Sequence, residues 1–176
     1  MRRVVGVAVA IGAVLVAITA GCSSTTGGTA TTTTSDATAA LWDPCTQIPD
    51  SALRAAQVDP STKQSGIGGV EQHGWKICAW DSNPKKYAIS VYSTAKAPAE
   101  IAGKSGNIGQ KDVTIAGRTG TEFRSSGWDT QCNVVFPAAQ GAVQLQMLGR
   151  LSEDNPEDPC VMLARVGGAI VPVLPK

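Results

Sequence analysis

The segment Cys132-Asn-Val-Val-Phe136 is followed, after five residues, by Ala142-Val-Gln-Leu-Gln-Met-Leu148. In the second segment apolar side chains alternate with glutamines, in the order Val143, Gln144, Leu145, Gln146 and Met147. Because successive side chains of a strand point to opposite faces, the apolar residues share one face and the glutamines the other. This alternation is typical of an antiparallel sheet with one covered side. The intervening residues, Pro137 to Gly141, predict the turn of a hairpin.

Four further segments have the composition of strands, in two pairs: residues 75–80 with 87–92, and residues 112–116 with 119–124. Short turns at residues 81–84 and at Gly117-Arg118 connect the members of each pair. In the first pair, alternation places Cys78 and Trp80 on the same face. Trp80 is therefore expected to pack in the core beside a cysteine.

Two predicted helices begin with the same tripeptide, Asp-Pro-Cys, at residues 43–45 and 158–160. The aspartate caps free backbone N–H groups, and proline fits the first helical position. Residues 50–58 and 98–104 predict two more short helices. Arg165 is the only charge in the last helix before Gly167-Gly168, so this helix is expected to be largely buried against the sheet.

These elements predict one α+β domain over residues 41–176. Its core would be a mostly antiparallel sheet of five or six strands, with helices packed on one face. Such a domain has about 135 residues, which is the size of a single folding unit.

Four cysteines remain when Cys22 is set aside: Cys45, Cys78, Cys132 and Cys160. An even number in an exported chain indicates disulfides, for which three connectivities are possible. In each half of the domain a cysteine in the first turn of a helix can reach a strand cysteine, which favours Cys45–Cys78 and Cys132–Cys160. A zinc site is the competing interpretation, and the absence of any C-x-x-C pair argues against it. We therefore expect no metal ligands.

The first 21 residues have the pattern of a secretory signal. Arg2 and Arg3 precede an uncharged apolar run at residues 4–18, and small residues lead to Cys22. A cysteine directly after Ala-Gly is similar to a bacterial lipobox, although Thr19 stands where leucine is commonest. We therefore expect Cys22 to be diacylated, by palmitate-type chains, and the protein to be held on the extracytoplasmic face of the cell membrane. The alternative is an ordinary signal or signal anchor in which Cys22 is incidental.

Residues 22–40 consist of this cysteine and a Thr/Ser-rich stretch without a large apolar side chain, which predicts a flexible tether. Without residues 1–21 the chain has thirteen Lys and Arg against fourteen Asp and Glu, so its net charge is about −1. The basic residues are scattered along the sequence. The composition therefore does not indicate a nucleic-acid partner.

The lipobox, the tether, the opening Asp43-Pro44-Cys45, the Cys78-Ala79-Trp80 motif and the terminal Cys160 helix together resemble one family. It is a domain-of-unknown-function family of actinobacterial, mycobacterial-type cell-envelope lipoproteins. The resemblance covers about residues 41–175 and implies a lipoprotein of this fold in the envelope. It supplies no catalytic residues.

Catalytic and cofactor patterns are weak in this sequence. His73 is the only histidine, and it lies in a Gly-rich stretch without a nucleophile motif, so we expect a solvated loop residue. The acidic residues 153–158 lack the alternating pattern of a calcium loop and fit the positive N-terminus of the following helix. We expect no cofactor.

Three tryptophans are the candidate binding residues: Trp42, Trp75 and Trp128. They lie at the edges of predicted elements, where an aromatic side chain can be exposed for a ligand or partner. The favoured function is a ligand-binding or protein-interaction module of the cell envelope. The alternative is an envelope enzyme whose carboxylates, or Ser and Thr, are brought together by the fold, and a structural spacer comes third.

The predicted ligand of such a module is apolar or amphipathic and lies between the sheet and the Cys160 helix. This expectation depends on Gly167-Gly168, which remove side-chain volume next to the sheet. The alternative is that these glycines only end the helix and allow close packing of the backbone.

Overall fold

The computed structural model describes residues 41–149 and 157–176. The predicted signal (residues 1–21), Cys22, the tether and most of the acidic segment therefore lie outside the described residues.

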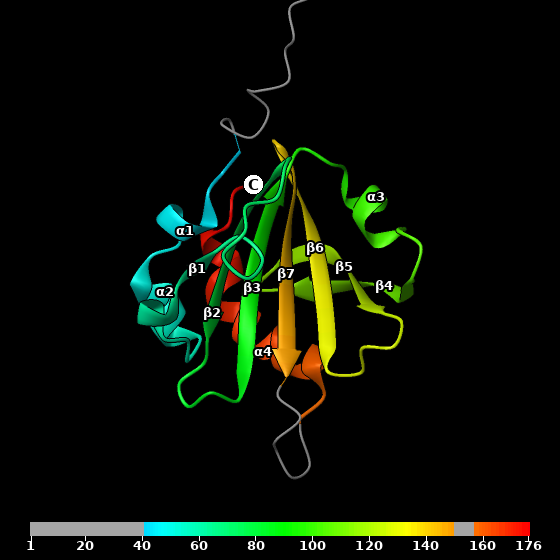
Figure 1. Ribbon diagram of the computed structural model, residues 1–176. Coiled ribbons are helices and arrows are strands. Elements are labelled where there is room, and N and C mark those ends of the chain that lie inside the picture. Colours follow the sequence, from blue (N-terminus) through cyan, green and yellow to red (C-terminus); the bar gives the residue numbers. More distant parts are fainter. Residues whose placement is uncertain (1–40, 150–156) are drawn as a thin grey trace, which may run out of the picture. The chain divides into compact units, whose positions relative to one another are not determined.

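The described chain forms one antiparallel sheet in the order β1-β2-β3-β7-β6-β5-β4 (Figure 1). The strands are β1 (Gln64–Ser65), β2 (Trp75–Asp81), β3 (Tyr87–Thr94), β4 (Asn107–Ile115), β5 (Arg118–Ser125), β6 (Gln131–Ala138) and β7 (Gly141–Gly149). The predicted number of five or six strands is wrong, because the sheet has seven. The strand that the sequence did not reveal is β1. It has two polar residues, too few to show a periodicity, and pairs with β2 through Gln64–Ala79 and Ser65–Cys78.

The helices are α1 (Pro44–Gln47), α2 (Asp50–Ala55), α3 (Pro98–Ala102) and α4 (Pro159–Ile170), with 3-10 turns η1 (Pro60–Thr62) and η2 (Val171–Val173). Both Asp-Pro-Cys caps form as predicted. An Asp43 carboxylate oxygen accepts from the Cys45 N–H at 2.9 Å, and Asp158 accepts from the Cys160 N–H at 2.8 Å. The second helix is shorter than predicted, since Gln57 takes a left-handed φ of 57° just beyond it.

One face of the sheet, called here the covered face, carries Val143, Leu145 and Met147 of β7. Helix α4 packs on this face against β6 and β7, and lies behind the sheet in Figure 1. Leu145 and the α4 residue Leu163 are both completely buried. Burying these side chains supplies the main stabilisation of the fold.

Two disulfides attach helices to the covered face. Cys45 at the start of α1 is bonded to Cys78 of β2, and Cys160 at the start of α4 to Cys132 of β6. The expectation of two disulfides is confirmed, with the favoured pairing. Each bond joins a capped first turn to a strand, at a Cα–Cα distance of 5.1 Å.

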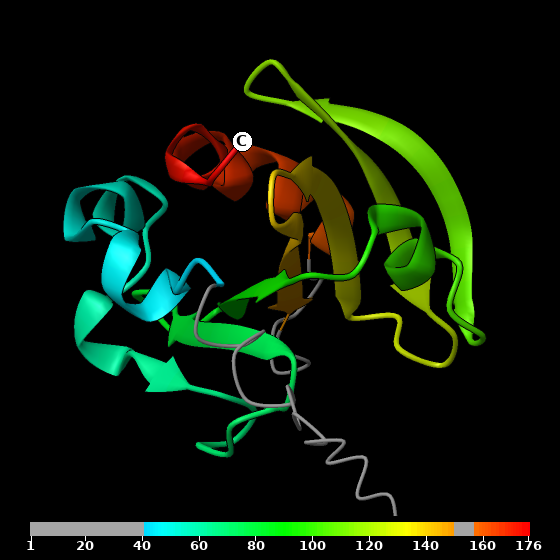
Figure 2. The same ribbon diagram turned by 90° about the horizontal axis from the view of Figure 1, so that it is seen from above.

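Helix α3 departs from the expectation that all helices pack on one face. Its Ile101 and Ala102 contact Phe123, Val135 and Ala142 on the side opposite to α4. Figure 2 shows α3 and α4 on either side of β6. The sequence of α3 is too short to show which strand face it contacts. The face that carries the glutamines is called here the cleft face. Of the helices that the structure describes, α3 is the one that packs on it.

Helix α4 is less enclosed than its composition suggested. Val161 is 58% exposed, and Arg165 points to solvent, where it pairs with Glu157 at 2.6 Å. Gly167 faces the sheet, and a Cβ there would lie 3.4 Å from Ile115 and 3.5 Å from Leu145. A methyl group would therefore already make ordinary van der Waals contacts with the sheet. The space beside Gly167 is too small for a ligand, which favours the alternative interpretation of close packing.

Candidate functional site

A cleft of about 560 Å³ opens on the cleft face. Strands β2, β3, β5, β6 and β7 form its base, and the Gly-rich residues 66–74 and α3 stand on its two sides (Figure 1). Its volume lies within the range of small-molecule sites in proteins. The cleft is therefore the candidate functional site of the described chain.

Three amide side chains, called here the amide floor, form the base of this cleft: Asn133, Gln144 and Gln146. The antiparallel register of β6 and β7 places Asn133 opposite Gln146. Asn133 Oδ1 accepts from Gln144 Nε2 at 2.8 Å and from Gln146 Nε2 at 3.1 Å. Because one oxygen accepts both bonds, the orientation of all three amides is fixed.

An aromatic pair lies beside the amide floor. Trp75 and Tyr92, on the neighbouring strands β2 and β3, make an edge-to-face contact with ring centroids 6.1 Å apart. The Tyr92 hydroxyl donates to Gln146 Oε1 at 2.9 Å. Burial raises the pKa of Tyr92, so the phenol stays protonated and keeps donating at neutral pH.

The charged residues of the cleft lie around α3. Lys96 precedes this helix and Lys104 follows it, and both line the cleft with exposed side chains. Within residues 41–149 and 157–176 neither lysine has an ion-pair partner. Glu100, the carboxylate of the lining, accepts from the Ala97 N–H at 2.9 Å and so caps α3. Among the described residues, the lining therefore carries two lysine cations without an ion pair and one carboxylate that is used as a helix cap.

The three candidate tryptophans lie in three different places. Trp75 lines the cleft, as described above. Trp42 is half-buried and packs against the core of the covered face. Trp128 is 59% exposed in the turn between β5 and β6 and is not part of the cleft lining. Trp80 is buried in the core that also contains Cys78, as expected.

The amide floor and Tyr92 were not among the predicted site residues. A signal for the floor was present in the sequence, because Gln144 and Gln146 interrupt the middle of an otherwise apolar strand. Asn133 is buried, with 1% of its surface exposed. It gives no such signal in the sequence, because a single asparagine does not form an alternating polar pattern. His73 lies on the exposed rim of the cleft, as expected for a loop residue.

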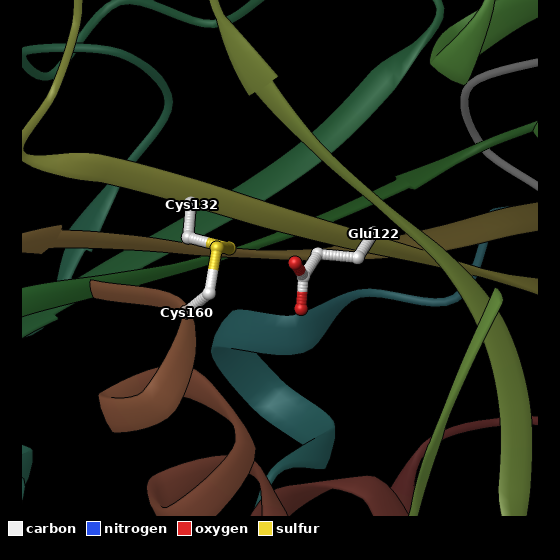
Figure 3. Close-up of side chains that lie close together, drawn as sticks. All are labelled: Glu122, Cys132 and Cys160. Atoms are coloured by element: carbon white, nitrogen blue, oxygen red, sulfur yellow. A yellow bond between two sulfur atoms is a disulfide. The ribbon is translucent and has the colours of Figure 1, made fainter. Parts of the chain in front are cut away.

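A second cluster of polar groups lies on the covered face, where the Glu122 carboxylate approaches the Cys132–Cys160 disulfide (Figure 3). Three buried residues of this kind would suit a metal ion if the cysteines were thiolates. Both sulfur atoms are used by the disulfide, and Glu122 pairs with Lys111 at 3.0 Å. The cluster therefore has a structural role in this oxidised form.

Comparison with known proteins gives a family. A family model described as "Protein of unknown function (DUF3558)" matches residues 17–172. No curated protein and no solved structure matches the chain. Among the described residues, no helix has the length and apolar character needed to cross a membrane.

Proposed function

The chain belongs to this family of proteins of unknown function, and from that premise we propose that it is a lipid-anchored binding module of the cell envelope. Its ligand occupies the cleft between α3 and the Gly-rich residues 66–74. The anchor is Cys22, and residues 23–40 hold the domain away from the membrane surface.

The anchor part of the proposal is supported by the sequence. Two arginines, an apolar run and Ala20-Gly21 precede Cys22, and the Thr/Ser-rich stretch follows it directly. At about 5–6 Å × √n, this stretch would separate the domain from its anchor by roughly 20–25 Å.

The observation that carries the binding function is the fixed amide floor. Polar side chains inside a sheet are normally turned to solvent or covered, but Asn133 and Gln144 are buried and bonded to each other at the base of an open cleft. A site whose groups are already held in place loses little entropy when a ligand binds. The aromatic pair beside the floor gives the apolar contact that such sites usually contain.

The binding function is tested with the full chain in detergent micelles, labelled with ¹⁵N and titrated with a library of small polar fragments. We expect fragments to shift the Trp75 indole signal and the side-chain amide signals of the floor, while the Trp128 indole signal stays in place. A Gln146→Leu variant should lose these shifts, and Trp128→Ala should keep them. Fragments that shift neither the floor nor Trp75 would overturn the binding function.

The anchor is tested separately by mass spectrometry of protein extracted from membranes. We expect an N-terminal Cys22 carrying two acyl chains. A Cys22→Ala protein that is still diacylated and retained in the membrane would contradict this assignment.

A further inference from the structure

We propose that the cleft binds an acidic saccharide, whose ring packs on the Trp75–Tyr92 pair and whose carboxylate or phosphate group lies between Lys96 and Lys104. This inference rests on the proposed binding function and names the chemical class of the ligand.

The aromatic pair is suited to a sugar ring. One face of a pyranose presents C–H groups, whereas its rim carries hydroxyls, so it needs an apolar surface beside polar groups. Trp75 is half-buried, and none of the hydrogen bonds within the described residues uses its indole N–H. Its ring supplies apolar area and its N–H remains as a donor at the same place.

The amide floor is suited to hydroxyl groups. Each glutamine Nε2 has two hydrogens and uses one on Asn133, so one donor remains on each. Gln144 Oε1 accepts no hydrogen bond from the described part of the chain, and Gln146 Oε1 keeps a second lone pair beside the Tyr92 bond. The floor therefore offers donors and acceptors side by side, and a hydroxyl is both.

The same floor disfavours an apolar ligand. Covering the floor with hydrocarbon would remove water from the remaining amide groups without replacing its hydrogen bonds, which costs about 1–3 kcal/mol for each group. The ligand proposed for this cleft therefore differs from the apolar or amphipathic ligand that the sequence predicted beside the Cys160 helix. A saccharide can satisfy the amides and the aromatic pair together.

The position of the floor also disfavours an extended peptide. Peptides that bind to sheets usually add a strand at an edge, where backbone N–H and C=O groups are free. Strands β3, β7 and β6 lie inside the sheet with a neighbour on each side. A ligand in the cleft must therefore bind through side chains.

The two lysines determine the charge of the ligand. Lys96 and Lys104 lie on either side of α3, and the Glu100 carboxylate between them in sequence is held by the Ala97 N–H. A lysine ammonium attracts carboxylate and phosphate groups alike. The charge therefore predicts an acidic sugar of either kind.

The test uses the full chain in detergent micelles, with tetragalacturonate and mannose 6-phosphate as the acidic probes. Maltotetraose is the control saccharide without charge, and hexaglutamate is the control for acidic charge without a sugar ring. We expect at least one acidic saccharide to shift the amide floor and Trp75 signals more strongly than maltotetraose. Its affinity should fall as the salt concentration rises, because the lysines are exposed.

Variants separate charge from stacking. Lys96→Gln combined with Lys104→Gln should weaken binding of the acidic saccharide about tenfold at low salt. Lys85→Gln combined with Lys176→Gln removes the same charge outside the cleft and should leave the affinity unchanged. Trp75→Ala should abolish binding, and thermal melting of each variant shows that it is folded.

Three results would overturn the inference: stronger binding of hexaglutamate than of either acidic saccharide, saccharide binding that survives Trp75→Ala, or no saccharide binding at all. If polar fragments still shift the floor in the last case, the binding function stands and only the ligand class fails. If neither fragments nor saccharides shift it, both proposals fail.

Discussion

The two faces of β7 differ although they belong to the same nine residues. On the covered face, Leu145 and Met147 are completely buried under α4. On the cleft face, Gln144 and Gln146 both donate a hydrogen bond to the side-chain oxygen of Asn133, at the base of an open cleft. The first face makes contacts that need no partner, whereas the second keeps polar groups that a second molecule can use.

In this small domain the main stabilising contacts and the proposed binding site lie on opposite faces of the sheet. Both disulfides and the long helix act on the covered face. The cleft face receives one five-residue helix at its far end and a Gly-rich segment on the other side. Substitutions on the two faces should therefore have separable effects on stability and on the cleft.

The largest effect is expected when a leucine of the covered face is replaced by glutamine, the residue type of the cleft face. Leu145→Gln removes a buried apolar side chain and adds an amide without a partner, so the free energy of unfolding should fall by about 4 kcal/mol. Gln146→Leu, one residue away, should change it by about 1 kcal/mol or less while removing ligand binding. Urea denaturation measures both. Equal losses for the two variants would show that the faces are not specialised.

Removal of a disulfide should give the next largest effect. The double variant Cys132→Ala/Cys160→Ala opens a loop with a sequence separation of 28. In the chain-entropy model this costs about 3.6 kcal/mol of unfolding free energy. The Cys45→Ala/Cys78→Ala pair, with a separation of 33, should cost nearly the same. The cleft signals should stay unchanged in both variants, and their loss would link the disulfides to the site.

Asn133→Ala tests whether the cleft face contributes to stability at all. The substitution leaves the Nε2 groups of Gln144 and Gln146 without their acceptor, which should cost about 2 kcal/mol. Gln140→Ala is the control, since its bond to Ser93 is 3.4 Å long and its loss should cost less than about 0.5 kcal/mol. Equal urea midpoints for Asn133→Ala and the unmodified protein would show that the floor is held by other contacts.

The smallest effect concerns the cap of α4. Burial raises the pKa of Asp158, but the N–H groups of Cys160 and Val161 and the Arg124 guanidinium together lower it below the ordinary value. Since the folded-state pKa lies below the unfolded one, its stabilisation is complete above about pH 4 and is lost as the pH falls through the folded value. Asp158→Ala should cost about 1 kcal/mol at pH 7 and progressively less in acid.

Asp158→Asn is the matched control for the cap, because asparagine also accepts the Cys160 N–H. Asp158→Asn should lower the free energy of unfolding less than Asp158→Ala does at pH 7. It should also remove the part of the pH dependence of stability that comes from this carboxyl group. A pH profile of urea midpoints compares the three proteins. Parallel profiles for Asp158→Ala and the unmodified protein would contradict the assignment.

The strands and caps were predictable because their signals are local. Alternation in β7 fixes which residues share a face, and an Asp-Pro-Cys tripeptide carries its own capping group. The placement of α3 was not predictable, since five residues can bury an apolar side on either face of a sheet. Strand β1 was not predicted for a related reason. Its two residues have no pattern of their own, and the strand exists because it pairs with β2.

The candidate site was only partly predictable. Trp75 was expected at an element edge and does line the cleft, but Trp42 and Trp128 have the same kind of sequence context and lie elsewhere. Gln144 and Gln146 were visible as a polar face. Their meeting with Asn133 follows from the register of β6 and β7, which no residue pattern in one strand determines.

The Cys45–Cys78 bond also determines how the domain carries a mechanical load. A pull on the chain at Leu41 reaches Cys45 within four residues and then passes through a covalent bond into β2. That strand is held to β3 by seven register pairs, from Trp75–Thr94 to Asp81–Ala88, which share the tension. Residues 46–74, which include α2 and the Gly-rich side of the cleft, belong to the loop that this disulfide closes and lie outside this force path. A domain stretched at its N-terminal end would therefore keep this side of the cleft relaxed.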